Sequence, residues 1–351
     1  MTNKISKIIN YIKEHNLDGV LLISMPNVFY VSGFTGDNVI LFISPEKALL
    51  ITDSRYTLQA EEQSPDFQVV TAKGSLVKEL KDLKLKKLGF EADRVTCAQL
   101  DAFKKTLEGC EFEDASAFMN EIRIIKAAEE IDLIRTAAQI ADDAFAHILK
   151  FAKVGMTERE IALELEFFMR KNGAESVSFD TIVAAGDHGA MPHAEPSDRV
   201  IKDGDCVVMD FGCKYKGYCS DMTRTVFFGK ADERQLEVYN SVLNAQKAAL
   251  AQIKAGVCEN APDKAAREEL AKSNLDKYFT HSLGHGVGVE IHEDPRMAPK
   301  CTGALKENML VTVEPGVYID GFMGVRIEDL VVVTADGYEN LTKSEKDVII
   351  L

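Results

Sequence analysis

The sequence has few of the features that would place a protein in a membrane or outside the cell. No apolar run approaches the ~20 residues that a membrane-spanning helix requires. The N-terminal segment MTNKISKIINYIKEH is amphipathic and rich in lysine, unlike a signal peptide. The seven cysteines are odd in number and include no C-x-x-C pair, which favours reduced thiols over disulfides or a structural zinc site. We therefore expect a cytoplasmic protein.

Positive charge is also scarce. Lys plus Arg number 41 and Asp plus Glu number 56, which gives a formal net charge of −15. Such an acidic surface repels phosphate backbones and anionic lipids, so we expect neither nucleic acid nor a membrane as a partner. Hydrophobic residues make up 46% and charged residues 28% of the chain, a composition typical of globular proteins. Its 351 residues suffice for two ordinary domains.

Residues 1–122 predict an α/β domain. Short apolar runs typical of strands alternate here with amphipathic segments typical of helices. This alternation favours a layered sheet in which some strands are parallel. The expected strands cover 19–23, 39–43, 48–52, 67–70 and 88–91, and the expected helices lie near 3–15, 75–84 and 97–107.

Residues 123–351 predict a second domain, of the α+β class, because hairpins and flanking helices replace regular alternation. A long amphipathic helix is expected over 129–155, with Gly155 in its C-terminal cap. Thr157 and Glu160 form a capping box for the next helix. The other expected elements are a helix over 231–254 and strands over 181–186, 206–212, 218–228, 309–316 and 325–334.

Two aspartates lie in the predicted hairpin VVMDFGCKYKGYCSDMTRT. With Tyr215-Lys216 as a two-residue loop, Asp210 and Asp221 lie directly opposite each other, with their Cβ atoms ~4.5–5.5 Å apart. Like charges so placed repel each other unless one or two divalent cations lie between them. The alternative is a pair of exposed aspartates near a turn, and a one-residue slip would place them on opposite faces.

A second acidic pair lies in VTVEPGVYIDGFMGVRIEDLVVV. Glu314 and Glu328 are symmetric about Gly321, which falls inside a plausible connection between two strands. Arg326 shares a strand face with Glu328, so we expect it to brace that carboxylate by charge-assisted hydrogen bonds. A surface salt bridge is the alternative for this segment.

Three of the seven histidines lie in HSLGHGVGVEIHEDP, residues 281–295. His281 and His285 are four residues apart, but no glutamate follows the first and the interspersed glycines oppose a helix, so H-E-x-x-H is excluded. We expect the glycines to let the backbone approach a crowded site with His285 as a ligand. His292 and His193, which lies in MPHAEP, are further candidates. The alternative for each is an ordinary core histidine.

Four carboxylates and one imidazole suit hard or borderline cations such as Mn²⁺, Co²⁺, Fe²⁺ or Zn²⁺. From spacing alone, the prediction is a carboxylate-rich metal site with one or two ions.

The ordered ligand set resembles that of the pita-bread metallopeptidase family, which includes methionine aminopeptidase, aminopeptidase P and prolidase. The segments MDFG, SDMTRT, GHGVGVEIHE, EPGVYI and VRIEDL carry this resemblance, which covers about 125–351. Residues 27–60 are similar to the extra domain of prolidases, aminopeptidases P and creatinases, a domain that methionine aminopeptidases lack. Creatinases lack the metal ligands, all of which are present here. The resemblance therefore implies an Xaa-Pro peptidase with a pita-bread catalytic domain.

The resemblance also implies a mechanism in which a hydroxide held between two divalent metals attacks the scissile carbonyl. We expect Mn²⁺, with Co²⁺, Zn²⁺ or Fe²⁺ as alternatives. Asp210 would chelate one metal, His285 and Glu314 the other, and Asp221 and Glu328 would bridge both. Glu314 would also handle the proton of the water.

Other residues match family positions near the substrate. His193 and His292 would steady the tetrahedral intermediate and help to protonate the departing proline nitrogen. His281, Tyr318 and Arg326 match positions that support the ligands, and Arg296 would pair with the carboxylate of a bound proline.

Several alternatives stay open at this point. The motifs do not separate aminopeptidase from dipeptidase activity. A hydrolase of another small amide and a non-catalytic binding protein on the same scaffold are competing hypotheses. The N-terminal domain implies a homodimer in which that domain restricts the length of the peptide substrate.

Overall fold

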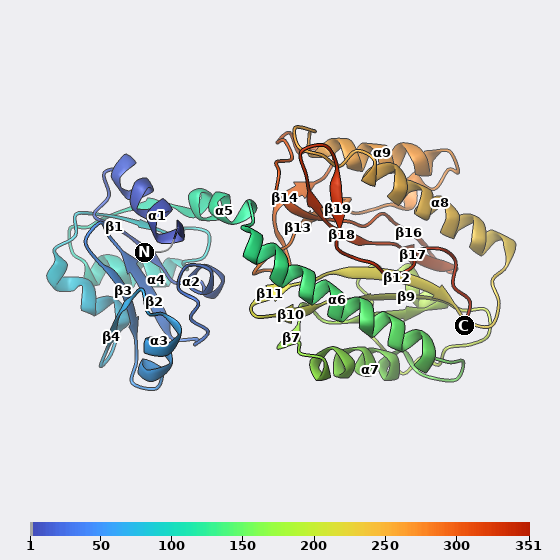
Figure 1. Cartoon of the computed structure of the whole chain (residues 1–351), viewed down its shortest axis with the longest axis horizontal. Coiled ribbons are helices and arrows are strands. Elements are labelled where there is room, and N and C mark those ends of the chain that lie inside the picture. The colour runs from blue at the N-terminus through green and yellow to red at the C-terminus, as the bar shows by residue number, and fades with distance from the viewer. Residues whose placement is uncertain (1–2) are drawn as a thin grey trace. The chain divides into compact units, whose positions relative to one another are not determined.

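The computed structural model describes residues 3–351, and Figure 1 shows their course. The chain divides into two compact units, the first ending at Arg123 and the second spanning Ile124–Leu351. None of the helices within residues 3–351 has the length and apolar character needed to cross a membrane.

The first unit is built on a six-stranded mixed sheet. Its elements are α1 (Asn3–Glu14), β1 (Gly19–Leu22), α2 (Met25–Ser32), β2 (Val39–Ile43), β3 (Ala48–Thr52), α3 (Thr57–Gln63), β4 (Gln68–Thr71), the 3-10 helix η1 (Leu76–Leu83), β5 (Lys87–Phe90), α4 (Cys97–Thr106), β6 (Glu111–Asp114) and α5 (Ser116–Ile124). The strand order is β4-β3-β2-β1-β5-β6. The β1–β5, β5–β6 and β3–β4 pairs are parallel, so the parallel strands predicted from the alternating pattern are confirmed.

Apolar spacing explains these elements. In α1 the isoleucines recur three or four residues apart, and Ile5, Ile8, Ile9 and Ile12 are all buried. Strand β2 has the sequence VILFI and is buried at every position, as expected for a strand covered on both faces.

The second unit contains two successive sets of paired helices and antiparallel strands. Its elements are α6 (Ala128–Phe151), α7 (Glu158–Lys171), β7 (Ser176–Val177), β8 (Ile182–Ala185), η2 (Gly186–Ala190), β9 (Cys206–Phe211), β10 (Cys213–Tyr215), β11 (Tyr218–Cys219), β12 (Met222–Phe227), α8 (Glu233–Leu250), α9 (Asn260–Ala271), η3 (Asp276–Tyr278), β13 (Gly284–Gly286), β14 (Glu293–Met297), β15 (Leu310–Val313), β16 (Gly316–Ile319), β17 (Met323–Arg326), β18 (Asp329–Val333) and β19 (Tyr338–Asn340). Figure 1 shows the strands between the α6–α7 and α8–α9 pairs. The predicted α/β and α+β classes are confirmed.

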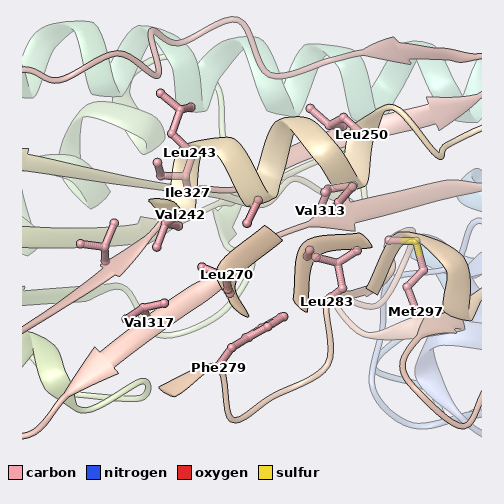
Figure 2. Packing of buried hydrophobic residues seen from close by; sticks show 14 of the residues in the cluster. Val242, Leu243, Leu250, Leu270, Phe279, Leu283, Met297, Val313, Val317 and Ile327 are labelled. Carbon is pink, nitrogen blue, oxygen red and sulfur yellow. The ribbon is translucent and has the colours of Figure 1, made fainter. Parts of the chain in front are cut away.

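Two hydrophobic clusters hold the strands of this unit in place. One joins α8 and α9 to the strands from β14 to β18, and Figure 2 shows Val242, Leu243 and Leu270 from the helices with Val317 and Ile327 from the strand side. The other joins α6 and α7 to β8, β9 and β12. Because close-packed interiors resist even small displacements, side chains at the strand ends have fixed positions.

The loop of the first acidic hairpin differs from the prediction by one residue. Tyr215 pairs with Tyr218, so Lys216 and Gly217 form the loop rather than Tyr215 and Lys216. Both loop residues have positive φ, 45° and 81°, as a type I′ turn requires. Glycine reaches such values without strain, which is why the turn is placed there.

This shift changes the partner of Asp210. In the observed register Asp210 pairs with Thr223, so the prediction that it lies directly opposite Asp221 is wrong. Asp221 precedes Thr223 by two residues and is the diagonal neighbour of Asp210. Because side chains alternate between faces with a period of two, this displacement keeps both aspartates on one face.

The second acidic hairpin has the predicted register. Strands β15 and β18, and then β16 and β17, pair in one continuous register. Glu314 and Glu328 lie where the two ladders are interrupted, directly across from each other. The hairpin turns at Gly321, whose φ of 67° favours glycine. The predicted symmetry about Gly321 is therefore confirmed.

One helix end was predicted wrongly. Helix α6 ends at Phe151, because Ala152 already has the extended values φ −69° and ψ 139°. Gly155, with φ 94°, lies in the following turn and does not cap the helix. The capping box of Thr157 and Glu160 at the start of α7 is confirmed.

Candidate metal centre

The residues predicted to bind metal lie around one cavity of about 620 Å³ within the second unit. They come from segments that are far apart in the sequence. The residues predicted to contact substrate or to support the ligands line the same cavity. The full set is Asp210, Asp221, His285, Glu314, Glu328, His193, His292, His281, Arg296, Tyr318 and Arg326.

Asp210, near the end of β9, has one carboxylate oxygen hydrogen-bonded within the protein and one without a partner in the described chain. Nη2 of Arg326 donates to Oδ2 of Asp210. Oδ1 of Asp210 is buried and has no hydrogen-bond partner among residues 3–351. The expectation that Arg326 braces Glu328 is therefore wrong. Strand β17 packs beside β9, and the guanidinium reaches across to the carboxylate of that neighbouring strand.

Three ligand atoms already form a compact group. Asp221, His285 and Glu328 each offer one such atom, and these atoms lie within 4.8 Å of one another. Nε2 of His285 lies 3.5 Å from Oδ2 of Asp221 and 3.4 Å from Oε1 of Glu314. Donor atoms at such separations can share one cation, since metal bonds to nitrogen and oxygen are ~2.0–2.2 Å long.

The imidazole of His285 is neutral, and its Nε2 is free to bind a cation. Its Nδ1 lies 3.0 Å from the carbonyl oxygen of Gly286. A carbonyl only accepts, so Nδ1 carries the proton and Nε2 presents its lone pair to the carboxylates. Burial lowers the pKa of His285 to about 4, which keeps the ring neutral.

The glycines beside His285 are required by close backbone contacts. A Cβ atom at Gly284 would lie 2.0 Å from the carbonyl oxygen of Thr312, and one at Gly286 would lie 2.3 Å from that of Asp294. The expectation that glycine lets the chain approach a crowded site is confirmed.

The carboxylates of the cavity resist ionisation without a cation. Burial, together with the nearby carboxylates, raises the pKa of Asp221 and of Glu328 well above the ordinary range. Burial also raises the pKa of Glu314 to about 8. Oε2 of Glu328 accepts a 2.8 Å hydrogen bond from Thr223, whereas its Oε1 is buried without a partner in the described chain. Unpaired acceptors and crowded carboxylates fit divalent metal ions.

A series of hydrogen bonds connects Arg326, Tyr318 and His281 beside the predicted metal ligands. Nη1 of Arg326 donates to the hydroxyl of Tyr318. Burial raises the pKa of Tyr318 to about 12, so the hydroxyl keeps its proton and donates it to Nε2 of His281 at 3.0 Å. Nδ1 of His281 in turn lies 2.8 Å from the carbonyl oxygen of Ser282, and burial lowers the pKa of this ring to about 4. Each hydrogen bond from Arg326 through Tyr318 and His281 to Ser282 therefore pairs one donor with one acceptor.

His193, His292 and Arg296 form a more open side of the cavity. The rings of His285 and His292 meet edge to face, with centroids 4.4 Å apart. Partial burial and the charge of Arg296 lower the pKa of His292. Arg296 is the cross-strand partner of His285 in the β13–β14 pair.

Comparisons with known proteins agree with this geometry. Residues 132–335 match the model of metallopeptidase family M24, and residues 4–125 match that of the creatinase/prolidase N-terminal domain. The chain belongs to metallopeptidase family M24. It is therefore a peptidase whose centre takes divalent metal ions.

Relatives of this M24 peptidase match it over almost its whole length. An Xaa-Pro dipeptidase from Pyrococcus horikoshii is 38% identical, with 99% of each chain covered. The structure of an Xaa-Pro dipeptidase from Bacillus anthracis has a TM-score of 0.95 at 44% identity, again with 99% of each chain covered. That of an X-Pro aminopeptidase from Thermotoga maritima has a TM-score of 0.91 at 40% identity, covering 96% of this chain and 98% of the other.

Two threonines that sequence reasoning missed contact the predicted metal ligands of the peptidase. Oγ1 of Thr223 donates to Glu328, and Oγ1 of Thr312 donates to Oε1 of Glu314 at 3.2 Å. A signal was available, because Thr223 follows Asp221 by two residues and Thr312 precedes Glu314 by two. In a strand such pairs share a face.

A buried ion pair was also missed. Nζ of Lys126 lies 2.9 Å from Oε2 of Glu293, and their side chains are only 3% and 6% exposed. The pair holds the segment that follows His292. The two residues are 167 positions apart, so local spacing gives no signal for the contact.

Removal of the metal ions is expected to lower the thermal unfolding midpoint of the peptidase, and more strongly at pH 8 than at pH 6. Glu314 has a pKa of about 8 in the metal-free fold, against ~4.3 for an unfolded glutamate. Its protonation therefore contributes stability that is fully present below pH ~4.3 and is lost as pH rises through the folded pKa of about 8. Bound cations replace those protons and abolish the loss.

Calorimetry on dialysed metal-free and metal-loaded protein, at equal ionic strength, measures the difference between the two midpoints at each pH. Glu328→Gln is the matched variant and should shrink the pH dependence of the metal-free midpoint. An equal loss of stability at both pH values would contradict the prediction.

Proposed function

We propose that this peptidase hydrolyses the bond between an N-terminal residue and a following proline in short peptides. The convergence of four carboxylates and His285 on one cavity, with two buried carboxylate oxygens unpaired within residues 3–351, carries the proposal. The dipeptidase and aminopeptidase relatives support the substrate class. We assign the catalytic groups to a domain of residues 123–351, preceded by an N-terminal domain of residues 1–122.

We propose that the centre holds two divalent ions, with Mn²⁺ as the first choice and Co²⁺, Zn²⁺ or Fe²⁺ as alternatives. Asp210 would bind one ion, His285 and Glu314 the other, and Asp221 and Glu328 both. When bound, such ions polarise a carbonyl oxygen and lower the pKa of a water molecule. The oxygen-rich donor set with one imidazole supports Mn²⁺.

The protein's own groups would handle the protons and orient the peptide. Glu314 would take a proton from the attacking water, which suits a carboxylate whose metal-free pKa is about 8. His193 and His292 lie on the open side of the cavity, where they would stabilise the tetrahedral intermediate and protonate the leaving proline nitrogen. His281, Tyr318 and Arg326 would hold this arrangement in place.

We also propose a cytoplasmic homodimer whose N-terminal domain limits substrate length. The cysteines within residues 3–351 are all free thiols, which supports a reducing compartment. A monomer in light scattering would contradict the dimer.

Metal-stripped protein is expected to cleave Ala-Pro only after a divalent ion is restored, with Mn²⁺ the most effective. Cleavage of Ala-Pro but not Ala-Pro-Ala would identify a dipeptidase. Cleavage of the tripeptide would identify an aminopeptidase, or an enzyme with both activities. His285→Ala should abolish the metal-dependent rate, because it removes the imidazole ligand, and full activity would contradict that assignment.

If neither peptide is cut with Mn²⁺, Co²⁺ or Zn²⁺, the substrate class is wrong. Hydrolysis of another small amide by the same protein would then replace it.

Arg296→Ala is expected to reduce kcat/KM for Ala-Pro by about 10-fold or more, mainly through KM, and to affect Ala-Pro-Ala much less. The reason is that only the dipeptide presents a free proline carboxylate, and hydrogen bonds to charged groups contribute ~1.5–3 kcal/mol. Steady-state kinetics on both peptides measures the effect. Lys300→Ala, on the same exposed segment, is the control. Equal losses on both peptides would exclude the carboxylate contact.

A further inference from the structure

The segment that brings His193 to the cavity is residues 186–199, which comprise the 3-10 helix η2 and the irregular chain after it and are called the loop below. It lies outside the strands that carry the proposed metal ligands. His193 is exposed, so the course of its backbone decides where the imidazole lies. The loop meets the metal centre at Pro192, whose carbonyl oxygen accepts a 3.3 Å hydrogen bond from Nη1 of Arg326. A loop needs further fixed points to hold a side chain within the tolerance that catalysis demands.

Glu158, the first residue of α7, supplies fixed points at both ends of the loop. Its side chain is completely buried. Oε1 accepts from the backbone N–H of Ala185 at 2.8 Å, just before the loop begins. Oε2 accepts from the N–H of Ser197 at 3.0 Å and from its hydroxyl at 2.6 Å, near the end of the loop. Nδ1 of His188 lies 2.8 and 2.9 Å from the two oxygens.

The backbone of α7 reinforces this anchor. The N–H of Glu158 donates to the carbonyl oxygen of Arg199, and that of Arg159 donates to the carbonyl oxygen of Ser197, both at 3.1 Å. The first N–H groups of a helix have no partner inside the helix, so they are free to bind a neighbouring chain. Residues 197–199 therefore form a fixed end of the loop.

We propose that Glu158 is a positioning residue for catalysis, which clamps residues 185 and 197 so that His193 faces the bound peptide. The proposal rests on the proposed function, in which His193 contacts the substrate. An ionised carboxylate only accepts hydrogen bonds, and the backbone N–H groups of Ala185 and Ser197 only donate. A glutamine of the same shape would turn its amide N–H₂ toward one of these donors, and the clamp would open at that end.

Glu158→Gln is expected to lower kcat/KM for Ala-Pro by about 10- to 100-fold, mostly through kcat, since a misplaced catalytic group costs rate more than binding. The dissociation constant for Mn²⁺ should stay within about twofold of the original, because the ligands lie on other elements. Glu160→Gln is the matched control. It removes one negative charge from the same helical turn, while glutamine still serves a capping box, and it should leave both constants unchanged.

A double variant that combines Glu158→Gln with His193→Ala distinguishes a positioning role of Glu158 from a general loss of folded protein. If Glu158 acts through His193, then Glu158→Gln should cause less than a twofold further loss of kcat/KM when the imidazole is already absent. A merely structural role would lower the active fraction by the same factor in both backgrounds. An equal loss with and without His193 would overturn the proposal, as would full activity of Glu158→Gln.

Hydrogen exchange measured by mass spectrometry gives a readout that does not depend on the substrate. Amides of residues 185–199 should exchange at least tenfold faster in Glu158→Gln and at the original rate in Glu160→Gln, and unchanged exchange in both would overturn the proposal. If Glu158→Gln does not fold, Ser197→Ala replaces it in the same cycle with a smaller expected loss. This substitution removes the hydroxyl that donates to Glu158 and accepts from the N–H of Arg199, and leaves the backbone contact of Ser197 to Glu158 in place. A wild-type protein inactive on Ala-Pro would refute the proposed function, and an unimpaired His193→Ala variant would refute the role assigned to His193. In either case the exchange data would still decide whether Glu158 holds the loop.

Discussion

The second unit depends on one electrostatic constraint, the gathering of four carboxylates in a cavity with little access to water. Two unit charges 4 Å apart repel with ~4 kcal/mol at an effective dielectric of ~20. In this cavity a carboxylate oxygen of Asp221 lies within 4.8 Å of one of Glu328. Within the described chain, Arg326 is the cation in direct contact with these carboxylates, and it pairs with Asp210 alone. Burial, and after it the repulsion from neighbouring carboxylates, raises the pKa of Asp221 and of Glu328. Divalent ions reduce this repulsion, so metal binding also stabilises the core around the carboxylates.

The strands hold the carboxylates close together even without bound ions. Asp210 and Asp221 share one face of the first hairpin, and Glu314 and Glu328 lie across from each other at the break in the second. His285 enters on a strand whose flanking glycines allow close backbone packing. Because hydrophobic clusters cover the sheets on the side of each helix pair, the repelling side chains cannot move apart without disrupting the core.

Sequence reasoning was most successful where a local rule decides the structure. Symmetry about Gly321 placed Glu314 opposite Glu328 because a tight turn fixes hairpin register. The same rule failed by one residue at Lys216-Gly217, where the positive φ of glycine moved the turn, although the period of two preserved the face. The partner of Arg326 was not predictable, because the guanidinium reaches a strand 116 residues away, and no local spacing encodes that contact.

Hydrogen-bond satisfaction separates two kinds of buried carboxylate in this unit. Both oxygens of Glu158 and both of Asp142 accept hydrogen bonds from backbone or side-chain donors. Asp329 likewise forms an ion pair with Arg224, which is itself buried. Asp210 and Glu328 each keep one buried oxygen without a partner in residues 3–351. An unpaired buried carboxylate oxygen is costly, and a bound cation would supply the missing interaction. Asp142, Glu158 and Asp329 therefore hold the fold together, whereas the unpaired oxygens of Asp210 and Glu328 are acceptors available to the metal ions that we propose.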